Sequence, residues 1–324
     1  MSWTNVIQNR DNKLLKWKEQ RNIFYKCNPI LFEMLKTLKA RETAFLGSSI
    51  DGASPVRCIK AHQVGYLESN FKSYNFYNRP YNVYISLALL QGIPMFSFAP
   101  VIRRKQQNEF NIKFKEYVYD YDLAFDFEGK ASRKFGREEE MDFYISVLED
   151  ENIPYELIDE KRGYEVICKH QDIFNLCWRQ VKRIKKSFDD YNVPYVLKFS
   201  GGGFHVRIMG NYLPKGTSWE ERVNFCKDFA SKIQSIFALS TLDMSIYDLR
   251  RVFKAPYSID VKSGLVALPL NDFEFESNNI PSDYNYLCDP NRIIEIKDKI
   301  KFRGLLERKG NKDNFNKYYK EVVE

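Results

Sequence analysis

The sequence predicts an α+β protein in which a central, largely antiparallel sheet is flanked by helices, with helical additions at the termini. Three observations support this fold class. Aromatic and acidic side chains alternate over residues 117–128, which is typical of a strand. Residues 137–158 and 178–199 each have the pattern of an amphipathic helix, an Asn-(Ile/Val)-Pro-Tyr turn and a strand. Strand pairs around a glycine turn at 200–203 and a hairpin through Lys262–Gly264 complete the sheet.

The remaining elements follow from composition and turn residues along the 324-residue chain. In order, we expect helix within the basic residues 1–40, strands at 41–47 and 56–61, a polar helix near 65–76, a strand at 79–90, a basic loop at 101–107, a helix over 219–239 and a charged, mostly helical tail from 280. The chain is therefore divided into an N-terminal helical segment (1–40), a core (41–275) and a C-terminal helical extension (276–324).

Composition narrows the class of protein. The net charge of +7 and the pI of about 8.9 fit a polyanionic partner or an ordinary solvated surface. No apolar run approaches the length of a membrane span, and the first residues lack the apolar core of a signal peptide. Six scattered cysteines favour reduced thiols over a disulfide framework. We expect no membrane association, and a cytoplasmic or nucleoid location that would be nuclear in a eukaryote.

The alternating segment carries two acidic pairs. Asp126 and Glu128 point the same way on a strand and precede Gly129, where a ligand can approach, and paired carboxylates suit a hard divalent metal. Asp120 and Asp122 form the competing pair. The two pairs lie roughly 20 Å apart along an extended strand, so they cannot serve one metal site. The alternative is a solvent-facing acidic strand.

The segment SGGGFHVRI suggests a phosphate-binding turn. Three consecutive glycines after Ser200 let a phosphate approach exposed amide groups. His205 and Arg207 would share one face of the following strand. The alternative is a plain hairpin turn with a surface histidine.

Further candidates lie on either side of this turn. Asp243 follows a helix end and precedes a group of cations, which could bind a triphosphate or a template backbone or could form an ordinary basic edge strand. The cations are Arg250, Arg251, Lys254 and Lys262. Cys168, His170 and Cys177 have the ligand types of a zinc knuckle without a nearby fourth ligand, so structural thiols are favoured and structural zinc is not expected.

The order of these motifs resembles the catalytic small subunit of archaeal and eukaryotic DNA primases, in the archaeo-eukaryotic primase superfamily. The likeness covers roughly residues 30 to 270. It includes RETAF and VRCI, then RPYNVYIS before the acidic strand, and VFKAPYSIDVKSGLVALPL, which is its most specific part.

The resemblance implies a primase catalytic core at 41–275 that synthesises primers by two-metal phosphoryl transfer on a single-stranded DNA template. Asp126, Glu128 and Asp243 would be the catalytic ligands of Mg²⁺ or Mn²⁺, with Asp248 as a second choice for the third. Nucleoside triphosphates would be the substrates, and a primase large subunit is a conceivable partner. The implied nucleotide-binding residues are Ser200, Gly201, Gly202, His205, Arg41, Arg57, Arg251 and Lys254.

Departures from the family pattern leave alternatives open. The second acid is Glu128, and an Asp-x-Glu pair is more similar to the motif of stand-alone primase-polymerases. An end-joining polymerase is a related alternative for the class of enzyme. The basic residue usual in the glycine motif is missing, and Asp260 stands where the family has histidine. These changes also allow a non-catalytic, primase-like subunit that binds nucleic acid.

Overall fold

The computed structural model describes most of the chain from residue 115 onward and several strands before it. The described residues are 24, 31, 41–45, 56–58, 83–91, 115–160, 163–214, 218–249, 251–260, 263–270, 284–296 and 311–324. The expected polar helix at 65–76, the basic loop at 101–107, nearly all of the N-terminal segment and the expected boundary at 275 lie outside these residues, as do Arg250, Lys262 and the side chain of Arg57.

The described residues form an α+β structure of antiparallel sheets flanked by helices, which confirms the fold class at this level. The described strands belong to three sheets, whereas the sequence predicted one central sheet. The five-stranded sheet has the order β11-β3-β1-β2, with β4 also paired to β3. Its strands are β1 Arg41–Phe45, β2 Val56–Cys58, β3 Val83–Leu90, β4 Val118–Tyr121 and β11 Val252–Lys254.

The alternating segment, expected as one strand, is two strands in different sheets. β4 pairs with β3, whereas β5 (Leu123–Glu128) pairs with β10 (Gly203–Ile208). The chain changes sheet at Asp122, whose amide donates to the Leu87 carbonyl at 3.1 Å and whose Oδ1 accepts from the Gly210 amide at 2.9 Å. The acidic face is therefore buried at Asp120 and Asp122 rather than solvent-facing.

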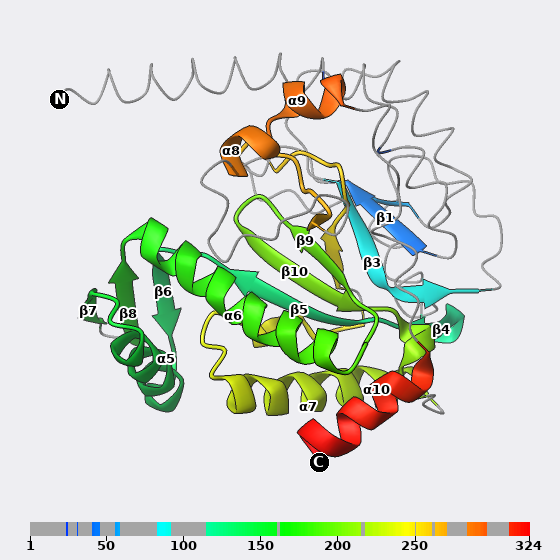
Figure 1. Ribbon diagram of the computed structural model, residues 1–324, viewed down its shortest axis with the longest axis horizontal. Helices are drawn as coiled ribbons and strands as arrows, with labels where there is room; N and C mark the ends of the chain where they lie inside the picture. Colours follow the sequence, from blue (N-terminus) through cyan, green and yellow to red (C-terminus); the bar gives the residue numbers. More distant parts are fainter. Residues whose placement is uncertain are drawn as a thin grey trace, which may run out of the picture.

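The second sheet, of order β5-β10-β9 with β9 at Val196–Phe199, is covered on one face by two helices, α6 (His170–Asp190) and α7 (Trp219–Phe237) (Figure 1). Alternate residues of its strands bury aromatic and aliphatic side chains there. Phe204 lies 5.3 Å from Phe174 and 5.0 Å from Trp178, both on α6, between ring centroids. The opposite face of the sheet is left for polar residues.

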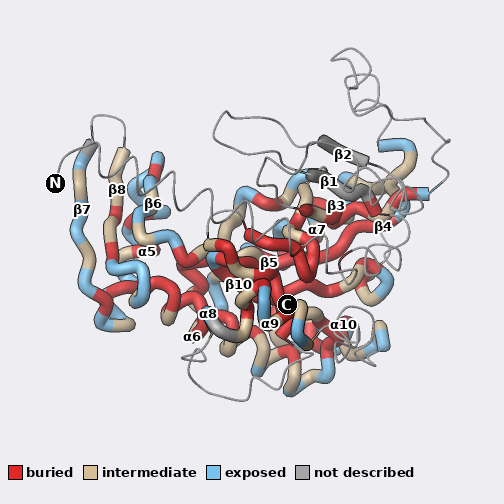
Figure 2. The backbone as a smooth tube through the Cα atoms, turned by 90° about the horizontal axis from the view of Figure 1, so that it is seen from above, coloured by how far each residue is buried: buried red, intermediate tan, exposed pale blue. Residues whose placement is uncertain are grey.

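A small lobe made of the third sheet and one helix projects from the start of α6 (Figure 1). Its sheet has the order β6-β8-β7, with α5 (Glu138–Asp150) packed against it around a separate cluster of buried side chains. The strands are β6 Ser132–Phe135, β7 Tyr155–Glu160 and β8 Gly163–Cys168. Every residue of β10 is buried, whereas burial decreases toward β7 at the margin of the lobe (Figure 2).

The described residues of the C-terminal segment, 284–296 and 311–324, are mostly helical. The short helices α8 (Tyr284–Leu287) and α9 (Pro290–Glu295) precede α10 (Lys312–Tyr318) and a π-helical turn at Tyr319–Val323. Phe315 of α10 lies 5.4 Å from Phe229 of α7, between ring centroids, so the end of the chain joins the main core. Within the described ranges, no helix combines the length and the apolar composition that a bilayer crossing requires.

Candidate metal and nucleotide site

Three carboxylates meet at one edge of the second sheet. Asp126 and Glu128 are alternate residues of β5, so both project from the same face. The segment after α7 runs along β5 on the side opposite β10: the Asp243 amide donates to the Asp126 carbonyl at 2.8 Å, and the Glu128 amide donates to the Thr241 carbonyl at 3.0 Å. One carboxylate oxygen from each of the three acids lies within 4.8 Å of the others.

A row of polar side chains crosses the sheet from these acids. In the strand register Asp126 lies opposite His205 on β10, and His205 lies opposite Lys198 on β9. The Nε2 atom of His205 is 3.3 Å from Oδ1 of Asp126, and its ring meets Phe253 of β11 edge-on at 4.4 Å. Aligned cross-strand positions put all three side chains on the face that the helices leave free.

Burial and neighbouring charges set the ionisation of His205. Burial, followed by the positive charge of Lys198, lowers the pKa of His205 to about 4, although Asp126 opposes the shift. Burial alone would raise the pKa of Asp126, but His205 and the nearby cations hold it below its usual value. The ring is therefore neutral at pH 7, and its Nδ1 has no hydrogen-bond partner among the described residues.

Lys198 was not among the candidates from sequence. Its side chain is buried, and its Nζ donates to the Lys254 carbonyl. Burial, Arg207 and Lys254 lower its pKa well below the ordinary value. The signal that could have found it is a lysine inside the apolar strand VLKF, on the same side as Ser200 by period two.

The glycine turn is fixed between β5 and the hairpin at Asp260. Gly201 has a φ of +101°, and a Cβ there would lie 2.3 Å from Cβ of Asp260. Gly203 lies opposite Glu128, and a Cβ there would lie 1.9 Å from the Phe127 carbonyl oxygen. Gly202 is exposed and has no atom within 4 Å of the corresponding position. Ser200 is buried, and its amide closes the turn by donating to the Gly203 carbonyl at 2.9 Å.

The two described cations of the third segment have different partners. Arg251 is 3.7 Å from Asp243, between Nη2 and Oδ2, and also donates to the Ser245 hydroxyl at 3.2 Å. Lys254 is ion-paired with Asp260, which accepts in addition from the amide and hydroxyl of Ser263 at 2.8 and 3.0 Å. Arg251 therefore belongs to the acidic group, whereas Lys254 is tied to the hairpin beside the glycine turn.

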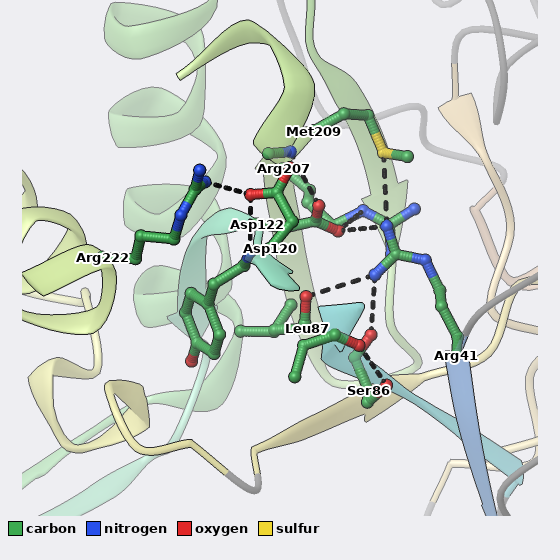
Figure 3. Close-up of polar contacts among 11 residues, drawn as sticks. Arg41, Ser86, Leu87, Asp120, Asp122, Arg207, Met209 and Arg222 are labelled. Carbon is green, nitrogen blue, oxygen red and sulfur yellow. Dashed lines mark hydrogen bonds and ion pairs between the residues drawn. The ribbon is translucent and has the colours of Figure 1, made fainter. Parts of the chain in front are cut away.

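Arg41, which the resemblance predicts to lie near a nucleotide, belongs to a second polar network within the fold (Figure 3). Its guanidinium is 2.8 Å from Oδ2 of Asp122 and donates to the Ser86 carbonyl at 2.9 Å, with both charged side chains buried. Arg207 approaches the same carboxylate at 3.5 Å, and Arg222 pairs with Asp120. The competing acidic pair is thus occupied by arginines.

The zinc candidates have different surroundings in the described part of the chain. Cys168 belongs to the buried cluster of the small lobe, whereas Cys177 belongs to the main core. His170 is exposed at the start of α6 and stacks on Phe174. Among the described residues, the only group of three or more mutually close acidic, histidine or cysteine ligands is that of Asp126, Glu128 and Asp243.

Comparison with protein families and with curated proteins gives no match for this sequence. The chemistry of the site must therefore be inferred from its own residues. Three partly exposed carboxylates, a neutral histidine and a glycine turn within one sheet edge can bind a divalent cation and a phosphate together.

Proposed function

We propose that the chain is a divalent-metal-dependent nucleotidyltransferase of the primase type, which joins nucleoside triphosphates on a single-stranded DNA template. The observation that carries the proposal is the group of Asp126, Glu128 and Asp243, which come from segments far apart in the sequence. Their side chains are 22%, 30% and 21% exposed, so an ion can reach them. Three carboxylates are the hard oxygen donors that suit Mg²⁺ or Mn²⁺.

The charges around the acids fit this reading. Three close carboxylates repel one another, and cations beside them offset that repulsion. Lys130 is 2.5 Å from Glu128, and Arg251 is 3.7 Å from Asp243. A bound divalent ion would stabilise the charge of a transferring phosphoryl group and activate the attacking hydroxyl.

Neighbouring groups suit the triphosphate of an incoming nucleotide. Gly202 leaves open space beside the backbone of the turn, where a phosphate can approach amide donors. His205 lies beside the acids, with its Nε2 atom 3.3 Å from Oδ1 of Asp126. The buried amine of Lys198, whose pKa is lowered by burial, lies next to His205 in the sheet. Arg251 is 31% exposed and can contact either the triphosphate or the template.

A non-catalytic nucleic-acid-binding role has less support, because phosphate binding alone does not need three carboxylates close enough to share a divalent ion. The site residues are compatible with each of the three alternatives: a primase subunit, a stand-alone primase-polymerase and an end-joining polymerase. What these enzymes share is metal-dependent phosphoryl transfer, and this shared chemistry is what the site residues support.

The test is primer synthesis and extension on single-stranded DNA with ribo- or deoxynucleotides and Mg²⁺ or Mn²⁺. Asp126→Asn and Asp243→Asn should reduce incorporation to background without changing the melting temperature by more than a few degrees. Asp248→Asn is the matched control, since Asp248 is an exposed acid near Asp243 that lies outside the group. Incorporation that survives Asp243→Asn or metal chelation would contradict the proposal.

A further inference from the structure

The segment that delivers Asp243 has no regular structure of its own. The last turn of α7 ends at Ala238, which has the left-handed conformation (φ 50°, ψ 56°), and the chain then runs irregularly to Asp243. A single bridge between Leu242 and Phe127 attaches it to β5. An irregular segment holds its shape only if its backbone donors and acceptors find partners elsewhere.

Gln180, a completely buried residue of α6, supplies several of these partners. Its Oε1 accepts from the amide of Thr241 at 3.0 Å and from the Thr241 hydroxyl at 2.7 Å. Its Nε2 donates to the Ala238 carbonyl at 3.2 Å and to the Ser240 hydroxyl at 3.1 Å. Both hydrogen atoms on Nε2 and both lone pairs of Oε1 thus form hydrogen bonds with residues 238–241.

Arg133 holds the same segment from the small lobe. It donates from Nη1 to the Ser240 carbonyl at 2.6 Å and from Nη2 to the Leu242 carbonyl at 3.4 Å. Its guanidinium lies over the rings of Phe135 and Tyr144, at 5.6 and 5.3 Å from their centroids. Stacking on two aromatic rings fixes the orientation of the planar group.

Together these contacts account for the backbone of residues 240–242. Each of the six N–H and C=O groups has a partner, and three of those partners are the side chains of Gln180 and Arg133. The others are the carbonyls of Ala238 and Leu239 and the amide of Glu128.

We infer that Gln180 and Arg133 are positioning residues, which hold the Asp243 carboxylate at the distance from Asp126 and Glu128 that a shared metal ion requires. They act through the backbone of residues 238–242. The role rests on the proposed function insofar as Asp243 must be a metal ligand. Residues that orient metal ligands typically change metal affinity by about 10- to 100-fold when they are replaced.

The experiment combines amide hydrogen exchange with direct Mn²⁺ titration of the full chain. Gln180→Met keeps the size of the side chain but removes both donors and acceptor. We expect the amides of Thr241, Asp243 and Glu128 to exchange at least about 10-fold faster, and Mn²⁺ affinity to fall by about 10-fold. The amides that pair β9 with β10 should keep their exchange rates, which separates a local effect from general unfolding.

Two further variants keep the test decisive. Gln171→Met is the matched control, because Gln171 lies on α6 but bonds to Asn175 at the exposed surface. Arg133→Met should weaken Mn²⁺ binding in the same direction, and it replaces Gln180→Met if that variant does not fold.

The outcomes distinguish this inference from the proposed function. Unchanged exchange and unchanged Mn²⁺ affinity in both Gln180→Met and Arg133→Met would overturn the positioning role. Faster exchange in Gln180→Met, combined with wild-type Mn²⁺ binding that survives Asp243→Asn, would instead refute the metal site and with it the proposed function.

Discussion

Two acidic pairs on neighbouring strands meet very different surroundings. Asp122 is completely buried, pairs with Arg41 and accepts from a backbone amide, so its charge is already used within the fold. Asp126 is partly exposed beside Glu128 and Asp243. Breaking a buried ion pair typically costs about 3–5 kcal/mol in the free energy of unfolding, so Asp122 stabilises the fold. Asp126, in contrast, retains carboxylate oxygen atoms that a ligand can reach.

Asp260 offers a test of a buried charge beside the glycine turn. Burial alone would raise its pKa, but Lys254 and the hydrogen bonds from Ser263 hold the pKa below the ordinary value of 3.8. A depressed folded-state pKa contributes stability above that ordinary value, and this contribution is lost as pH falls through the folded pKa. Asp260→Asn should therefore reduce the free energy of unfolding at pH 7 by about 3 kcal/mol, with a smaller loss at pH 3.

Urea unfolding of both proteins at the two pH values measures this difference. Asp142→Asn, at an exposed position of α5, should change the free energy of unfolding by less than about 0.5 kcal/mol at either pH. A loss in Asp260→Asn that is equal at both pH values, or larger in acid, would show that the ionised pair with Lys254 does not stabilise the fold.

At the scale of elements, short turns determine where a helix ends and where the next strand begins. The two Asn-(Ile/Val)-Pro-Tyr turns end α5 and α6 with Asn152 and Asn192 at φ values of 54° and 52°. Asparagine tolerates this left-handed conformation better than most residues, and the following proline stops the helix. The same local device starts β7 in the small lobe and β9 in the main sheet. The same turn sequence therefore connects a helix to a strand in two different sheets.

The glycine turn provides the matching prediction for strand pairing. Gly203→Ala would bring a methyl group against the Phe127 carbonyl and push β10 away from β5. We expect a loss of about 1–3 kcal/mol in the free energy of unfolding, measured by urea denaturation, together with weaker Mn²⁺ binding. Gly202→Ala is the control at the adjacent position, where the added methyl group meets open space. Equal stability of the two variants would mean that the turn does not need close contact with β5.

At the scale of the whole molecule, the candidate site draws on more than one sheet. The acids lie along β5, whereas β11 next to them belongs to the five-stranded sheet. Arg41 of that sheet, Asp122 at the crossing point and Arg207 of β10 form the buried ionic link between the two (Figure 3). Arg133 adds a connection from the small lobe. The relative placement of acids and cations is therefore a property of the assembled sheets.

Template binding is a prediction about the molecule as a whole. The net charge of +7 and the cations beside the acids should make affinity for single-stranded DNA fall steeply as salt rises, because bound phosphates release counterions. Arg251→Ala should flatten the slope of log affinity against log salt by about 0.7 if Arg251 contacts a template phosphate. If it contacts the triphosphate instead, the KM for nucleotide should rise at an unchanged slope.

Fluorescence anisotropy of a labelled oligonucleotide over a KCl series measures this slope. Arg137→Ala is the control, since Arg137 is 77% exposed in the small lobe and pairs with Glu140. Affinity that is independent of salt, or an absence of binding by the chain alone, would contradict electrostatic binding of the template.

Some features could be predicted from local patterns. The helices of α5, α6 and α7, the turns that end the first two, and the projection of Asp126 and Glu128 from one face all follow from spacing along the chain. The order of motifs also singled out Asp243, which the structure brings to the other two acids. These features depend on a few consecutive residues, or on a resemblance that those residues carry.

The sequence by itself therefore determined the α+β class, the main helices and the acidic residues of the candidate site. Only the tertiary structure decided that residues 117–128 divide between two sheets, that Arg41 is held by Asp122, and that Lys198 and Gln180 belong to the surroundings of the acids. The physical reason is that periodicity fixes the direction of a side chain relative to its own strand or helix. Which partner it meets depends on hydrogen bonds and burial between segments dozens of residues apart, and no local pattern encodes that pairing.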